Sequence, residues 1–163
     1  MTCIRRLVVL TCAIGLVSSL ARAQDYSPVT DQRLNNPEAD NWLSYRGNLE
    51  GWGYSALDEI TADNVAELQP VWTYSTGVTG GHESPPVVND GVMFITTPAN
   101  EVLALDAASG DALWSYRHNL PENLIAFHRT NRGVALYGDK VFMATLDARV
   151  VALDAATGEK VWD

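Results

Sequence analysis

The chain has little cysteine and little positive charge. Its two cysteines, Cys3 and Cys12, both lie near the start, so residues 24–163 contain none. This part of the chain therefore has no disulfide and no C-x-x-C-H haem attachment site. Across the whole sequence, 11 Lys and Arg stand against 20 Asp and Glu, which gives a formal net charge of −9. Without a basic patch, this composition does not favour binding to nucleic acid.

Apolar runs long enough to cross a bilayer are also missing. The longest apolar stretch, residues 7–20, is short for a membrane span and follows an arginine pair that begins at Arg5. An Ala-x-Ala sequence ends at Ala23. This order predicts a secretory signal peptide over residues 1–23, cleaved after Ala23, and no stable membrane anchor. The residue before Cys12 fits a lipoprotein signal poorly.

One segment occurs twice. Ala104–Trp114 reads ALDAASGDALW and Ala152–Trp162 reads ALDAATGEKVW, 48 positions later, and Phe94 and Phe142 keep the same spacing. A strand-rich repeat of about 40–50 residues that closes on a Trp is typical of a β-propeller blade. The small Ala and Gly residues predict that the indole of one blade lies over the thin backbone of the next.

The repeat predicts an all-β, partial β-propeller with two full four-stranded blades over residues 83–163. Residues 24–82 form an N-terminal segment with a partial blade, and Trp72 is a candidate for its closing strand. Since a propeller needs at least about four blades, we expect an N-terminal piece of a longer protein that is truncated at residue 163. A complete small β domain is the alternative, but it would leave blade faces exposed.

Local signals predict the elements within these regions. Pro85 and Pro86 cannot donate ladder hydrogen bonds, so the inner strand Glu83–Val88 should pair weakly at its start. Asn89–Gly91 reads as a hairpin turn. The remaining predictions are an extended segment over 24–40, short strand-like pieces joined by tight turns over 42–54, a short helix over Ala62–Leu68 capped by Thr61, and a strand at Val71–Tyr74.

Several motifs resemble those of the quinoprotein alcohol dehydrogenases of the methanol/ethanol dehydrogenase family. The repeat Ala-x-Asp-x-x-[Ser/Thr]-Gly-x-x-x-Trp is similar to the tryptophan-docking motif of that family. The family's opening segment resembles Trp42-Leu-Ser-Tyr45, Tyr54-Ser55 and Ile60-Thr-Ala-Asp-Asn-Val65, and two of its cofactor-site motifs resemble Gly81-His-Glu83 and Asn131-Arg-Gly133. The resemblance covers essentially all of residues 40–163.

This resemblance implies a propeller of about eight blades with pyrroloquinoline quinone (PQQ) near its axis and Ca²⁺ or a similar cation beside it. It implies a periplasmic enzyme that oxidises an alcohol by hydride transfer to PQQ and passes electrons to a cytochrome c. The metal ligands and the catalytic base of the family belong to later blades, so we expect this chain alone to be inactive. The alternative is a non-catalytic propeller scaffold of the outer-membrane assembly type.

The resemblance also assigns cofactor-binding residues. Glu83 takes the position of a cofactor-contacting Glu, and Arg132 that of an Arg that contacts the cofactor carboxylates. The alternatives are a solvated strand-end Glu and a surface Arg paired with an acid such as Asp139. A binding scaffold would have no use for a Glu and an Arg that both face a cofactor.

Phe127 and His128 depart from the family, which often carries two adjacent, disulfide-bonded cysteines at this place. Phe127 is a candidate to stack on the cofactor ring and His128 to bond a carboxylate or to titrate. The alternative for Phe127 is an ordinary core aromatic. Of the other histidines, we expect His82 to fix the turn before Glu83 and His118 to be exposed.

Overall fold

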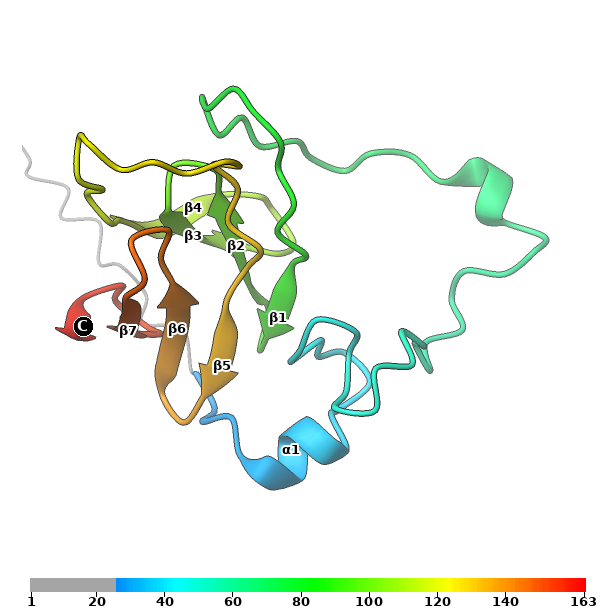
Figure 1. The fold of residues 1–163 in the computed structure, drawn as a ribbon. Helices are drawn as coiled ribbons and strands as arrows, with labels where there is room; N and C mark the ends of the chain where they lie inside the picture. The colour runs from blue at the N-terminus through cyan, green and yellow to red at the C-terminus, as the bar shows by residue number, and fades with distance from the viewer. Residues whose placement is uncertain (1–25) are drawn as a thin grey trace, which may run out of the picture.

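The computed structural model describes residues 26–163 and consists mainly of two four-stranded antiparallel sheets that lie side by side (Figure 1). The predicted signal peptide, with its cleavage after Ala23 and both cysteines, lies outside the described residues. The strands are β1 (Val87–Asn89), β2 (Val92–Thr97), β3 (Glu101–Asp106) and β4 (Ala112–Arg117) in the first sheet, and β5 (Ala135–Tyr137), β6 (Lys140–Ala144), β7 (Val150–Asp154) and β8 (Lys160–Trp162) in the second.

Both sheets are simple meanders, in which each strand pairs with the next one along the chain. The prediction of an all-β fold with two four-stranded units is thereby confirmed. The first strand is shorter than predicted: β1 begins only at Val87, because Pro85 and Pro86 cannot donate to the ladder. The turn after β1 has positive φ at Asp90 (50°) and Gly91 (77°), as a tight hairpin requires.

The repeat produces the same row of side chains in each sheet. Phe94 pairs with Ala104, which pairs with Trp114, and the two aromatic rings meet with centroids 5.8 Å apart. In the second sheet Phe142 and Trp162 approach to 5.9 Å across Ala152. A small residue on the central strand leaves the space that the flanking rings fill. This explains why Ala recurs at this position of the repeat.

Trp114 also joins the two sheets. Its indole nitrogen donates to the carbonyl of Ala155 at 3.0 Å. Its ring lies so close to Gly158 that a Cβ placed there would be 2.5 Å from Cε3. The predicted docking of a Trp on the thin backbone of the neighbouring blade is confirmed.

Trp72 docks on the first sheet in the same manner. Its Nε1 donates to the carbonyl of Ala107 at 3.1 Å, and a Cβ on Gly110 would lie 2.6 Å from its ring. Trp72 therefore occupies the position of the closing Trp of a preceding blade. The strand predicted over Val71–Tyr74 is wrong, however, since this segment has no ladder partner among residues 26–163.

The segment before the sheets holds an unpredicted helix, α1 (Asp31–Asn35), so the prediction of an extended segment over 24–40 is wrong there. Thr30 caps the helix by accepting from the backbone N–H of Arg33 at 3.3 Å. On either side, Val29 bridges to Gly138 and Trp42 bridges to Val88. The segment is thus tied to both sheets.

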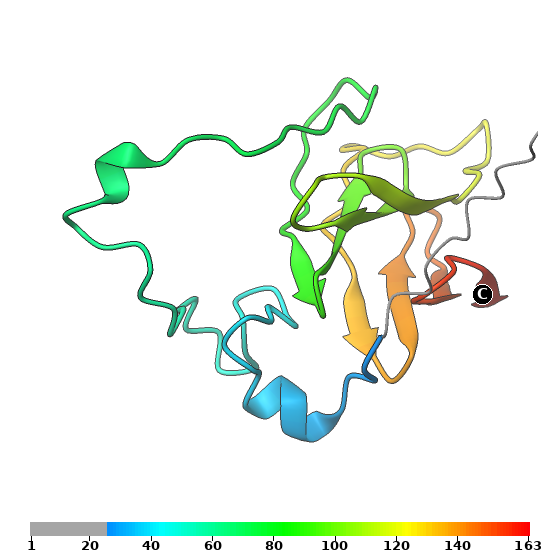
Figure 2. The same cartoon turned by 180° about the vertical axis from the view of Figure 1, so that it is seen from behind.

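Residues 55–70 form a long excursion that swings away from the sheets (Figures 1 and 2). It carries only a 3₁₀ turn, Val65–Glu67, preceded by Asn64 without a side-chain cap, so the helix predicted over Ala62–Leu68 with a Thr61 cap is wrong in type and extent. The strand-like pieces predicted over 42–54 are turns apart from the Trp42 bridge. In residues 26–163 no helix has the length and apolar character needed to cross a membrane.

Candidate cofactor site

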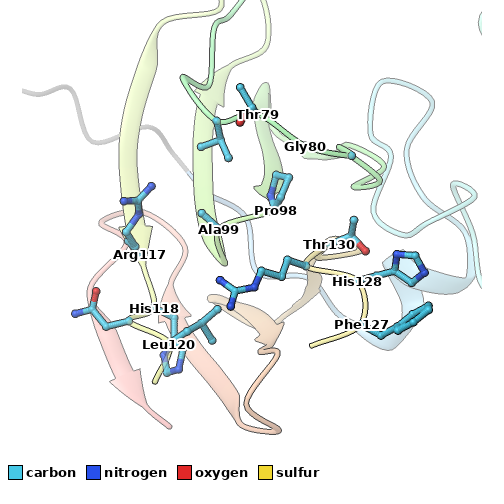
Figure 3. A pocket seen from close by; sticks show the side chains of 14 residues that line it. Thr79, Gly80, Pro98, Ala99, Arg117, His118, Leu120, Phe127, His128 and Thr130 are labelled. Carbon is cyan, nitrogen blue, oxygen red and sulfur yellow. The ribbon is translucent and has the colours of Figure 1, made fainter. Parts of the chain in front are cut away.

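A pocket of about 560 Å³ opens where the loops of the two sheets meet. Its residues come from four stretches: 78–81 before β1, 98–99 and 117–120 around the first sheet, and 127–130 between the sheets. Figure 3 shows Phe127 and His128 side by side at one end, Arg117 and His118 toward the other, and Pro98 between them. Most of these residues lie on loops that the rigid sheets position.

The charge of the pocket is opposite in sign to that of the chain. Its lining includes Arg117, Arg129, His118 and His128 and no Asp or Glu, although the chain carries a net charge of −9. Arg117 is paired with Glu101 at 3.5 Å, and Glu101 does not line the pocket. A concave surface of this composition suits an anionic ligand.

Phe127 and His128 are brought together at the pocket edge. Their rings meet edge to face, with centroids 4.7 Å apart and an interplanar angle of 89°. The Phe127 side chain is 97% exposed, so Phe127 does not belong to the core formed by residues 26–163. An exposed aromatic ring on a pocket rim is available to cover a flat ligand.

Glu83 and Arg132 also meet, although neither lines the pocket directly. Arg132 Nη2 forms an ion pair with Glu83 Oε2 at 3.1 Å, and the two side chains are 80% and 45% exposed. The acid that Arg132 pairs with at the surface is Glu83 and not Asp139, which pairs with Lys140. The Glu83–Arg132 pair adjoins the pocket.

Local structure holds this pair in place. The amide of Asn131 donates to Asn100 Oδ1 at 2.8 Å and to the carbonyl of Ala144 at 2.9 Å, so Asn131 links the two sheets directly before Arg132. His82 contacts the carbonyl of Gly80 at 3.2 Å through Nδ1. This contact confirms that His82 fixes the turn before Glu83.

His118 is mostly buried, so the prediction that it is exposed is wrong. Its side chain is 10% exposed, and Nε2 lies 3.1 Å from both carboxylate oxygens of Asp147 on the second sheet. The Thr145 hydroxyl donates to the same carboxylate at 2.5 Å. The hydrogen bonds from Thr145 and His118 lower the pKa of Asp147. His118 is therefore an inter-sheet contact that also forms part of the pocket wall.

The repeated aspartates are turn residues. Asp106 accepts from the backbone N–H groups of Ser109 at 2.8 Å and Ala108 at 2.9 Å, and these bonds lower its pKa. Asp154 repeats the arrangement in the second sheet. Within the described part of the chain, no group of three or more His, Cys, Asp or Glu is placed to hold a metal ion.

Sequence reasoning missed Arg129 and Arg117 as pocket residues. Each is a single Arg beside a histidine, which resembles an ordinary surface position. Only the packing of the 127–130 loop against residues 98–99 and 117–120 brings the two arginines to one pocket.

Two adjacent four-stranded antiparallel sheets, joined by the docked Trp114, define the fold as part of a β-propeller. Residues 42–163 match the family described as "PQQ: Glucose/ethanol/alcohol dehydrogenase, beta-propeller domain", and the chain belongs to this family.

Curated relatives support the same family assignment. The chain is 41% identical over 144 residues to a quinoprotein ethanol dehydrogenase of Pseudomonas putida, covering 84% of this chain and 23% of the relative. It is 36% identical over 148 residues to the dehydrogenase subunit of an alcohol dehydrogenase (quinone) of Gluconobacter oxydans, covering 86% of this chain and 20% of the relative. The chain thus spans about a fifth to a quarter of the length of these relatives.

Solved structures show the same relationship. The quinohemoprotein alcohol dehydrogenase ADHIIG of Pseudomonas putida HK5 matches with a TM-score of 0.77 at 34% identity, over 84% of this chain and 21% of that one. A europium-containing methanol dehydrogenase matches with a TM-score of 0.73 at 34% identity, over 80% of this chain and 24% of that one.

Proposed function

We propose that the chain is part of a quinoprotein dehydrogenase that oxidises an alcohol with PQQ as its cofactor. The observation that carries this proposal is the pocket with two arginines, two histidines and no carboxylate in its lining, adjoining the Glu83–Arg132 pair. The family and its relatives support the cofactor and the reaction class.

The residues present fit PQQ, which is flat and carries several carboxylates. A volume of about 560 Å³ is in the usual range for small-molecule pockets. Arg132, exposed except for its contact with Glu83, presents a planar fork of donors that matches a carboxylate. The ring of Phe127 is free to cover a flat face.

When bound, the quinone supplies the acceptor for the hydride that leaves the alcohol carbon. The residues of this chain bind and orient. Glu83 restrains the Arg132 guanidinium and keeps carboxylate oxygens available as hydrogen-bond acceptors. Phe127 and His128, in contact at the pocket edge, are placed to cover one side of a bound flat ligand.

Hydride removal also needs a base against the alcohol proton and a cation that polarises the quinone. We propose that Ca²⁺ or a similar cation serves here, held by residues outside the described part of this chain. The chain on its own should then show no dye-linked alcohol oxidation with added PQQ and Ca²⁺. We further propose that the protein works in the periplasm and delivers electrons to a cytochrome c.

Titration of the purified chain with PQQ, followed by quenching of tryptophan fluorescence, tests the cofactor assignment. We expect saturable binding that Arg132→Gln weakens by about five- to tenfold, roughly 1–1.4 kcal/mol. Arg46→Gln is the matched control, because Arg46 is exposed over the ring of Tyr45 and does not line the pocket. Absence of PQQ binding, or equal loss in the two variants, would refute the assignment.

A further inference from the structure

Arg129 differs from the other two arginines beside the pocket. Arg117 is paired with Glu101 and Arg132 with Glu83. Among residues 26–163, no carboxylate forms an ion pair with Arg129. Its guanidinium makes one long hydrogen bond, 3.5 Å from Nη2 to the carbonyl of Leu124.

An arginine in a pocket wall without a carboxylate partner keeps most of its donors for a ligand. A guanidinium offers five N–H donors in a fixed fork, and one long contact to a carbonyl leaves the fork largely unused. The surroundings add to the effect, since His128 and Thr130 flank Arg129 in the lining and contribute no negative charge. Arg129 is thus the best-placed cation in the pocket for an anionic group.

We propose that Arg129 binds a carboxylate of the molecule that enters this pocket. The carboxylate belongs either to the quinone cofactor or to an alcohol substrate that carries one, that is, a hydroxy acid. This inference rests on the proposed function, because it specifies which residue of the pocket selects the ligand. In the second case, Arg129 determines substrate class by favouring hydroxy acids over neutral alcohols.

The experiment separates the two sources with three probes. The chain, labelled with ¹⁵N, is titrated with PQQ, with 4-hydroxybutyrate and with neutral 1,4-butanediol. Binding is measured by calorimetry and by the shift of the Arg129 side-chain N–H resonance. Arg129→Gln removes the charge, Arg129→Lys keeps it without the fork, and Arg46→Gln controls for the loss of one positive charge elsewhere.

If the carboxylate is that of the cofactor, Arg129→Gln weakens PQQ binding by about five- to tenfold and 4-hydroxybutyrate leaves the Arg129 resonance in place. If it is that of a substrate, 4-hydroxybutyrate shifts the Arg129 resonance, 1,4-butanediol does not, and Arg129→Gln abolishes the binding. Arg129→Lys should be intermediate.

The inference is overturned if Arg129→Gln binds PQQ and 4-hydroxybutyrate as tightly as the unaltered chain, or if Arg46→Gln loses as much affinity. Failure of the proposed function has a different signature. The unaltered chain then does not bind PQQ at all, while a shift of the Arg129 resonance by 4-hydroxybutyrate still supports a carboxylate site.

Discussion

A methyl group added at Gly158 should disrupt the contact that joins the two sheets. An ideal Cβ at Gly158 would lie 2.5 Å from Cε3 and 2.6 Å from Cδ2 of Trp114, closer than Cβ atoms approach other atoms. The indole cannot move aside freely, because its Nε1 is bonded to Ala155 at 3.0 Å and its ring packs against Phe94. Gly158→Ala therefore has to separate the blades locally or displace the ring.

Two effects contribute to the expected loss of stability. Gly158 has φ of +75°, and an L-residue in the left-handed region costs about 1–2 kcal/mol. Forcing extra volume into a packed contact costs a further ~1–3 kcal/mol. Gly138 isolates the first effect: its φ is +59°, and a Cβ there would meet no atom within 4 Å. We expect a loss of about 1–2 kcal/mol for Gly138→Ala and about 2–5 kcal/mol for Gly158→Ala.

Urea denaturation followed by circular dichroism measures both free energies of unfolding. Repeating the Gly158→Ala measurement in a Trp114→Leu background completes a double-mutant cycle. Once the large ring is gone, the cost of the added methyl group should fall to that of Gly138→Ala. Equal losses for the two glycine variants in the unaltered chain would refute the docking argument.

Two further predictions concern buried and bridging polar groups. Asn131→Ala removes the donor to Asn100 Oδ1 and to the Ala144 carbonyl, so denaturation should show a loss of about 1–3 kcal/mol, and an unchanged stability would contradict this. The two hydrogen bonds from Arg33 lower the pKa of Glu38 from 4.5 to about 2, so this carboxylate stabilises the fold above pH 4.5 and the stabilisation is lost as the pH falls through about 2. By denaturation, Glu38→Gln should have a lower free energy of unfolding than the unaltered chain at neutral pH and nearly the same one near pH 2. A difference in free energy that persists at low pH would contradict the role given to the Glu38 carboxylate.

The parts of the fold that the sequence predicted correctly depend on local repeats. The Phe, Ala, Gly and Trp positions recur 48 residues apart, and each has a packing role that follows from its size alone. Ala104 is small because two rings meet across it, and Gly158 lacks a side chain because Trp114 lies on it. Such constraints are visible without coordinates.

The errors arose where distant contacts decide the local structure. Helix α1 has a local cap, but Arg33 also donates to Asn89 at 2.8 Å, 56 residues away. No local pattern reveals that partner. His118 resembled an exposed histidine, because its partner Asp147 lies 29 residues further on, in the other sheet. For Val71–Tyr74, strand-forming residues were present but a pairing strand was not among residues 26–163.

The candidate site contains residues that local sequence motifs predict and residues that only distant contacts bring together. Glu83 and Arg132 lie in motifs 49 positions apart, and the structure brings Glu83 Oε2 and Arg132 Nη2 to 3.1 Å from each other. Arg129 carries no motif and emerges only from the shape of the pocket.

The position of the site follows from how the two sheets are joined. Trp114 fixes one sheet on the other through strand and turn residues, and Asn131 ties the connecting loop to both sheets. Arg129 and Arg132 lie two residues before and one residue after Asn131, so their backbones start from a fixed point while their side chains remain exposed. An anchored loop with exposed cationic side chains has to order only those side chains when a ligand binds, which limits the entropy lost on binding. In the proposed function, the inter-sheet contacts therefore serve recognition as well as stability.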